Sequence, residues 1–145
     1  MSAERQFFDA NVLVNAHVRS AGAKHRRARV LLADLWNNKA GCLSIQVLQE
    51  FYVNITRQVA RPLDPADACQ IVADLGHWRL HSPTVNDVLE AVRLQQRYGL
   101  SFWDALIVTS AIQLSCSTVW SEDLNAGQDY DGARVVNPFT QTASG

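Results

Sequence analysis

The stretch RQFFDANVLV, residues 5–14, decides the fold of this chain. It opens with a short apolar strand pattern at 6–9 that ends on an acid, Asp9. The residues that follow have the apolar spacing of a helix, which either Asp9 or Asn11 can cap. A strand that leads directly into a helix is the building unit of α/β proteins.

The same alternation of short strands and longer helices continues to the end of the chain. Further strand patterns lie at 41–44, 78–82, 116–120 and 133–138, and helical patterns lie at 25–38, 44–58, 65–76, 84–99 and 102–115. Residues 121–132 are polar and rich in turn formers, which predicts a loop. We therefore predict an α/β sandwich whose central, mainly parallel sheet is flanked by helices.

Length and composition are those of an ordinary globular domain. The 145 residues predict a single domain over 1–145, with a core at about 6–139 and a frayed tail at 140–145. The net charge of −1 argues against a surface that is basic overall, although it allows a local basic patch. No apolar run reaches the length of a membrane span, and the first residues do not resemble a signal peptide, so we expect a cytoplasmic protein.

Cysteine and tryptophan residues are interpreted as packing residues. The three cysteines, Cys42, Cys69 and Cys116, have no metal-binding spacing and lie beside aliphatic residues, so we expect small buried side chains. The four tryptophans also adjoin aliphatic residues, which favours core packing over stacking on nucleic-acid bases.

Four acids interrupt apolar stretches that lie far apart in the sequence: Asp9, Glu50, Asp104 and Asp123. Carboxylates are rarely buried without a partner, because removing the charge from water costs several kcal/mol. A shared hard cation such as Mg²⁺, with Mn²⁺ as a substitute, would account for all four.

Chain topology predicts that these acids meet. Asp9 ends the first strand and Asp123 follows the fourth, so both lie at the carboxyl ends of strands, where open parallel sheets bind ligands. Glu50 and Asp104 lie on helices that begin at the same rim, and Ser101 can cap the second of these helices. There the metal would lower the pKa of a bound water and orient a phosphodiester for hydrolysis.

Each acid taken singly has an ordinary structural interpretation. Asp9 and Asp123 fit helix caps or turn residues, Asp104 is a favourable charge in a first helical turn, and Glu50 fits the polar face of an amphipathic helix. The metal site is preferred because one rim would hold all four.

The densest positive run is KHRRAR, residues 24–29. Such a run is most often a solvated helix face, and the alternative is contact with RNA phosphates through Lys24, Arg26 and Arg27. Neither interpretation locates a base contact.

At this point four segments carry a resemblance to a known family. They are FFDANVLV (7–14), LSIQVLQEFY (43–52), LSFWDALIVTSA (100–111) and VWSEDLNAGQDYDGARVVNPF (119–139), and they span nearly the whole chain. In order and context of the acids the chain resembles the PIN-domain family and, within it, the VapC-type toxins of bacterial toxin–antitoxin pairs.

The resemblance implies a PIN fold, with a sheet of four or five strands, and a Mg²⁺- or Mn²⁺-dependent endoribonuclease. It implies that Asp9, Asp104 and Asp123 bind the first metal, with Glu50 acting directly, through water or on a second ion. It further implies that Asn11 orients Asp9 and that Ser121 binds water or phosphate. Ser44 resembles the cap of the glutamate helix, and Asp129 and Asp131 are interpreted as turn residues.

The resemblance also implies partners. They are an RNA substrate, a second copy of the chain in a homodimer, and a cognate antitoxin that forms a hetero-oligomer with the toxin and places a basic residue among the acids.

Two other functions compete with this one. A PIN-like RNA-binding or scaffold module without catalysis is opposed by the presence of all four acids. A Mg²⁺-dependent phosphatase of another α/β fold is opposed by the first motif, which has Asn11 where a second aspartate would be expected.

Overall fold

The computed structural model describes residues 4–140, and most of the tail expected to fray lies outside them. A six-stranded sheet has the order β3-β2-β1-β4-β6-β5, and every neighbouring pair is parallel except β5 and β6. The strands are β1 (Gln6–Phe8), β2 (Gly41–Ser44), β3 (Arg79–His81), β4 (Thr118–Trp120), β5 (Asp129–Tyr130) and β6 (Ala133–Val136).

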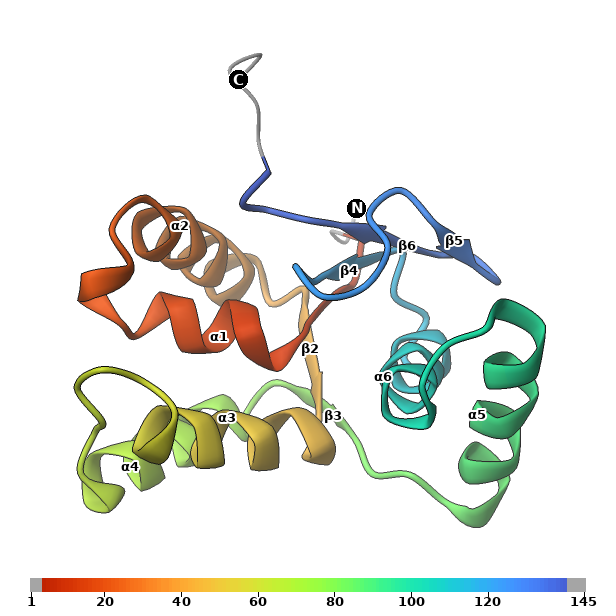
Figure 1. Cartoon of the computed structure of the whole chain (residues 1–145), viewed down its shortest axis with the longest axis horizontal. Coiled ribbons are helices and arrows are strands. Elements are labelled where there is room, and N and C mark those ends of the chain that lie inside the picture. Colours follow the sequence, from red (N-terminus) through yellow and green to blue (C-terminus); the bar gives the residue numbers. More distant parts are fainter. Residues whose placement is uncertain (1–3, 141–145) are drawn as a thin grey trace.

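Helices cover both faces of the sheet (Figure 1). On one side lie α1 (Ala10–Ala16), α2 (Ala23–Asn38), α3 (Ile45–Arg57) and α4 (Pro65–Leu75), with the short 3₁₀ turn η1 (Arg19–Ala21) after α1. On the other side lie α5 (Val85–Tyr98) and α6 (Phe102–Gln113). The predicted α/β sandwich is confirmed, and within residues 4–140 no helix is long and apolar enough to span a membrane.

The sheet contains one strand that the sequence pattern did not predict. Residues Asp129–Tyr130 lie within the predicted loop and pair antiparallel with β6. Tyr130 is buried there, and Asp131 adopts a left-handed backbone (φ 53°) at the turn, as expected of a turn residue. Two residues are too few to show an alternating pattern, which explains why the strand was missed.

Side-chain caps begin the helices that carry the acids. Asp9 caps α1, Ser44 accepts a hydrogen bond from the Val47 amide at the start of α3, and Ser101 accepts one from the Asp104 amide at the start of α6. Residues 105–111 of α6 are all buried, as expected for a helix enclosed by sheet and helices. This helix is therefore a rigid support for Asp104 in its first turn.

Two packing predictions need correction. Cys42 and Cys116 are buried as expected, but Cys69 is exposed on α4. Trp103 is 62% exposed, so the expectation of core packing is wrong for this residue. Trp36 is also exposed, at 42%. Aliphatic neighbours in sequence do not place a helical side chain in the core, because consecutive residues point in different directions around the helix.

A hydrogen-bonded Ser-His-Asp chain joins three elements on the α5–α6 side. His81, at the end of β3, contacts Ser110 of α6 (2.8 Å) and Asp87 of α5 (2.9 Å). Ser110 is fully buried in the middle of its helix, where no substrate can reach it. These hydrogen bonds therefore link α5 and α6 to β3, and the three residues are not a hydrolytic triad.

Candidate metal-dependent nuclease site

One pocket at the carboxyl edge of the sheet contains all four predicted acids. We call it the acidic pocket, and its volume is about 290 Å³. The strands β1, β2 and β4 end at this edge. β1 leads into Asp9, β4 leads into the loop of Asp123, and β2 leads into α3, which carries Glu50. Its lining is Asp9, Ala10, Asn11, Gln46, Glu50, Asn54, Asp104, Ile107 and Asp123.

Asp9 is the most deeply buried of the acids, at 6% exposure. Its carboxylate accepts hydrogen bonds from the Ala10 amide (2.8 Å) and from the Ser121 hydroxyl (2.8 Å). Burial nevertheless raises the pKa of Asp9 to about 6, with smaller contributions from the charges of Glu50 and Asp123. The protein thus holds a carboxylate where it is costly to ionise.

Ser121 forms hydrogen bonds both with Asp9 and with the loop that carries Asp123. It is fully buried, donates to Asp9 Oδ2, and its oxygen accepts from the backbone amides of Asp123 (3.1 Å) and Leu124 (3.3 Å). The expected contact with water or phosphate is therefore wrong, because the hydroxyl is enclosed and fully engaged. Ser121 instead couples Asp9 to the loop that carries Asp123.

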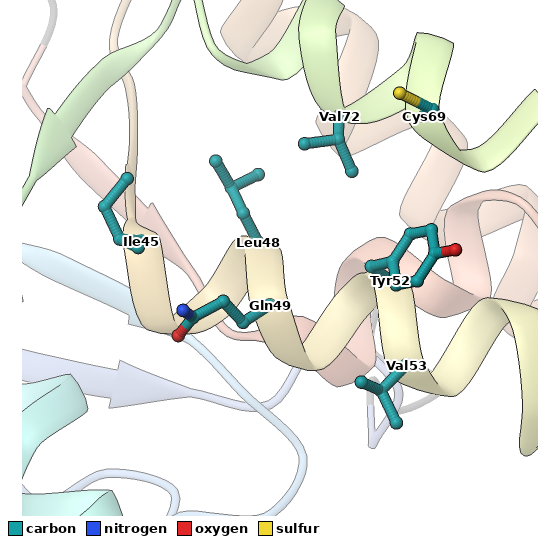
Figure 2. Close-up of a pocket in the computed structure, with 7 residues that line it drawn as sticks. All are labelled: Ile45, Leu48, Gln49, Tyr52, Val53, Cys69 and Val72. Carbon is teal, nitrogen blue, oxygen red and sulfur yellow. The ribbon is translucent and has the colours of Figure 1, made fainter. Parts of the chain in front are cut away.

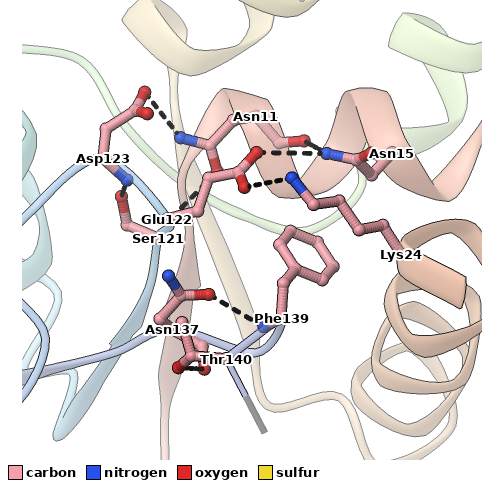
Figure 3. A network of polar contacts seen from close by, with 9 residues as sticks. All are labelled: Asn11, Asn15, Lys24, Ser121, Glu122, Asp123, Asn137, Phe139 and Thr140. Carbon is pink, nitrogen blue, oxygen red and sulfur yellow. Dashed lines mark hydrogen bonds and ion pairs between the residues drawn. The ribbon is translucent and has the colours of Figure 1, made fainter. Parts of the chain in front are cut away.

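Asn11 also has a different partner from the one expected (Figure 3). Its side-chain amide donates to Asp123 Oδ2 (2.8 Å), and its side-chain oxygen accepts from the Glu122 amide (3.4 Å). The residue expected to orient Asp9 thus orients the last acid. Because Asp123 is otherwise exposed, this hydrogen bond restricts its carboxylate.

Glu122 faces away from the acidic pocket toward α1 and α2 (Figure 3). Its carboxylate pairs with Lys24 Nζ (2.8 Å) and accepts a long hydrogen bond from Asn15 (3.4 Å), which separates its role from that of its neighbour Asp123. Lys24 and Arg27 line a small concave surface with Phe139, and Arg26 is exposed on the same helix. Their contact with RNA stays a prediction.

Glu50 lies half-buried on α3, next to a residue that the sequence reasoning missed. Gln46 donates from its amide to Glu50 Oε2 (3.3 Å) and to the Trp103 carbonyl (3.3 Å), so it links the helix of Glu50 to the first turn of α6. Burial raises the pKa of Glu50, and the charges of Asp104 and Asp123 raise it further. A glutamine one helical turn before the acid was the available signal.

Burial decreases from one acid to the next. Asp9 is buried, Glu50 and Asp104 are half-buried, and Asp123 is exposed. The expectation of four acids in apolar surroundings therefore holds fully for Asp9 alone. Asp123 is thus the acid of the pocket most accessible to solvent.

The donor set fits a hard cation that keeps part of its water. Within residues 4–140, no three His, Cys, Asp or Glu side chains converge closely enough to enclose a metal by themselves. Mg²⁺ usually retains several waters and needs only one or two direct carboxylates, so a wider set of acids can hold it. Gln46 Oε1, a buried oxygen of the pocket lining, has no hydrogen-bond partner among residues 4–140, which fits a hydrated ion as the missing donor.

Comparisons with known proteins bear on the family and the fold. The family model of the PIN domain matches residues 7–128. A search of curated proteins gave no significant match.

Three solved structures share the fold at low sequence identity. A toxin–antitoxin complex from Klebsiella pneumoniae has a TM-score of 0.69 at 19% identity, covering 92% of this chain and 98% of that one. VapC20 of Mycobacterium tuberculosis, a sarcin–ricin loop cleaving toxin, has a TM-score of 0.61 at 18% identity, covering 81% and 91%. VapBC2 of Rickettsia felis, bound to a promoter DNA fragment, has a TM-score of 0.62 at 15% identity, covering 90% and 96%.

Proposed function

The chain belongs to the PIN domain family, and from this premise we propose that it is a metal-dependent endoribonuclease, the toxin of a VapC-type toxin–antitoxin pair. The observation that carries the proposal is the acidic pocket, where acids from four separate segments meet at one sheet edge. Burial raises the pKa values of Asp9 and Glu50, and the charges of neighbouring acids in the pocket raise them further, so the pocket disfavours ionised carboxylates unless a cation is present. A scaffold module would have no need for this arrangement.

The proposed cofactor is Mg²⁺, for which Mn²⁺ can substitute. Asp9, Asp104 and Asp123 would hold it, and Glu50 would contact it through water or bind a second ion. When bound, the metal lowers the pKa of a water and neutralises charge on the phosphodiester. Asn11 and Ser121 keep Asp123 and Asp9 in place, and Glu50, whose pKa is raised, is suited to accept a proton from the attacking water.

Purified protein tests the proposed activity directly. We expect cleavage of single-stranded or looped RNA in Mg²⁺ or Mn²⁺, and loss of cleavage when EDTA removes the metal. A fluorescently labelled RNA resolved on a denaturing gel provides the measurement. Cleavage that persists in excess EDTA would contradict the metal-dependent mechanism.

The hydrogen bonds of Ser121 predict a measurable contribution to activity. Ser121→Ala should lower the cleavage rate by about 10- to 100-fold, because partners that orient metal ligands typically contribute this much. Ser117→Ala is the matched control, since Ser117 lies just before the opposite end of β4, and its hydroxyl contacts Glu4. Equal rates for both variants, at equal folded fractions by circular dichroism, would argue against the positioning role.

A cognate antitoxin is the proposed protein partner. The similar structures from Klebsiella and Rickettsia are toxin–antitoxin assemblies, and here an apolar groove of about 450 Å³ lies on α3, the helix that carries Glu50. Figure 2 shows this groove between α3 and α4. Exposed apolar surface of this kind marks a protein contact. Its lining is Ile45, Leu48, Gln49, Tyr52, Val53, Cys69 and Val72.

Expression in bacteria tests the toxin and its partner together. We expect growth arrest when the chain is expressed, and relief when the small reading frame immediately upstream is co-expressed. Val53→Glu, which places a charge in the apolar groove, should keep the arrest and weaken the relief. Relief that is as complete with this variant would exclude the groove as the antitoxin contact.

A homodimer remains a further proposal. On α5, Val85 is 76% exposed and Leu89 is 62% exposed, one helical turn apart, which is apolar surface that a second copy would cover. Analytical ultracentrifugation of wild type and Leu89→Glu checks it, since the charge should convert dimer to monomer.

A further inference from the structure

A second pocket lies beyond the C-terminal ends of α1 and α3. It has a volume of about 530 Å³ and is lined by His17, Val18, Arg19, Ser20 and Arg61. The first four residues follow α1, and the last follows α3, so two segments far apart in sequence form it. We call it the basic pocket, because three of its five side chains are basic.

Among residues 4–140, the two arginines of the basic pocket have no carboxylate partner. Arg19 and Arg61 are exposed, and within residues 4–140 neither forms an ion pair, although Lys24, Arg93 and Arg97 do. The acid nearest to Arg61 in sequence, Asp64, uses its side chain to cap α4. In a chain with a net charge of −1, two unpaired arginines converging on one hollow leave a local positive field.

His17, at the end of α1, is the third basic side chain that lines the pocket. Its ring packs edge-on against Phe51, and its Nδ1 lies 2.9 Å from the Leu13 carbonyl, which assigns the proton of a neutral ring to Nδ1 and leaves Nε2 free to accept or, when protonated, to donate. Burial lowers the pKa of His17, and the nearby positive charges of Arg29 and His25 lower it further. An anion in the pocket would offset those charges.

The two pockets lie along one pair of helices. In Figure 1, α1 and α3 run side by side away from the sheet edge. Asp9 is the N-cap of α1 and His17 is its C-cap. The two residues are eight positions apart, and at a rise of 1.5 Å per residue this separates the pockets by roughly 12 Å. Along α3, Glu50 and Asn54 line the acidic pocket, and Arg61 follows the end of the helix.

We propose that the basic pocket binds a backbone phosphate of the RNA substrate, away from the bond that is cleaved. This inference rests on the proposed function, because it supplies the substrate. The acidic pocket repels a polyanion except where a cation is bound, so affinity for RNA must come from positive charge elsewhere. Arginine suits this task, because its planar guanidinium donates two parallel hydrogen bonds to a phosphate.

RNA binding without cleavage tests the subsite. The affinity of an unstructured RNA oligonucleotide is measured by fluorescence anisotropy in EDTA, for wild type and for Arg19→Gln/Arg61→Gln. The double variant should bind about tenfold more weakly, and the slope of log K against log salt should fall by about 0.7 for each phosphate that the variant no longer neutralises. Arg97→Gln, which removes a like charge on the opposite side of the sheet, should bind as wild type does.

A second measurement uses inorganic phosphate in place of RNA. Phosphate should shift the ring proton resonances of His17 in wild type, and the double variant should lose that response. Equal RNA affinity and salt slope in wild type and double variant would overturn the subsite, as would an equal loss in Arg97→Gln. If only antitoxin binding weakened in the double variant, the pocket would belong to an acidic protein segment and the RNA assignment would be wrong.

The failures of the two proposals are distinguishable. Wild-type protein that neither binds nor cleaves RNA with Mg²⁺ or Mn²⁺ contradicts the proposed function. Wild-type protein that cleaves RNA, with a double variant of unchanged affinity, contradicts only the subsite.

Discussion

Asp104→Asn should lower RNA cleavage by roughly 10²- to 10³-fold, the range seen when one group that stabilises transition-state charge is removed. The substitution keeps the shape of the side chain and its place in the first turn of α6, where the backbone amide bonds to Ser101. Only the charge that would hold the cation is lost. Single-turnover cleavage of a defined RNA in saturating Mg²⁺ measures the effect, and growth arrest on expression should disappear with it.

Asp67→Asn is the matched control for this substitution. Asp67 also lies in the first turn of a helix, α4, and is outside the acidic pocket, so the change in charge and in helix electrostatics is the same. The control should cleave RNA as wild type does. If Asp104→Asn retained full activity, or if both variants lost it equally, Asp104 would not be a metal-site residue.

The strand order explains why the four acids were predictable from sequence. Asp9 ends one strand pattern and Asp123 lies three residues after another, and the carboxyl ends of parallel strands lie at one edge whatever the details of packing. Glu50 and Asp104 follow strong caps, which fix where their helices begin. Periodicity and caps are local properties, so the sequence encodes them directly.

The hydrogen bonds around the acids were not predictable in the same way. Asn11 bonds to Asp123, more than a hundred residues away, and Ser121 turns inward to Asp9. Both contacts depend on the path of residues 121–128, which have no periodic pattern that would predict their conformation. The burial of Gln46 depends likewise on how closely α6 packs against α3, which is a tertiary property.

The site combines one buried acid with others nearer to solvent, and this asymmetry has a functional reason. A buried carboxylate costs free energy unless a cation or a proton neutralises it. Asp9 is held by two short hydrogen bonds, so it cannot turn away to water. The ionised carboxylate therefore costs the folded protein stability, and binding of the proposed cation would remove that cost.

The stability of the metal-free protein should depend on pH through Asp9. Its pKa is about 6 in the folded protein, against 3.8 without perturbation, so the folded state binds the proton more tightly. The contribution of Asp9 to the free energy of unfolding should be greatest at and below about pH 4 and should fall as pH rises to about 6. The difference in pKa corresponds to a loss of about 3 kcal/mol.

The difference between wild type and Asp9→Asn removes the contributions of titrating groups that do not interact with Asp9. Asp87 and Asp131 have lowered pKa values and change stability in the opposite direction, but they are present in both proteins and cancel. Urea unfolding in EDTA from pH 4 to pH 8 measures the difference. As pH rises, the free energy of unfolding of Asp9→Asn should increase relative to that of wild type. Above about pH 7 the difference between the two proteins should be constant.

Addition of Mg²⁺ or Mn²⁺ at pH 7.5 should then stabilise wild type and have little effect on Asp9→Asn, because a ligand stabilises only the folded state that binds it. Ser121→Ala provides an internal check of sign. The Ser121 hydroxyl of wild type lowers the pKa of Asp9, so in the alanine variant the loss of stability should extend to higher pH. A wild-type minus Asp9→Asn difference that stays constant from pH 4 to pH 8, with no response to either metal, would contradict both the buried charge and the metal site built on it.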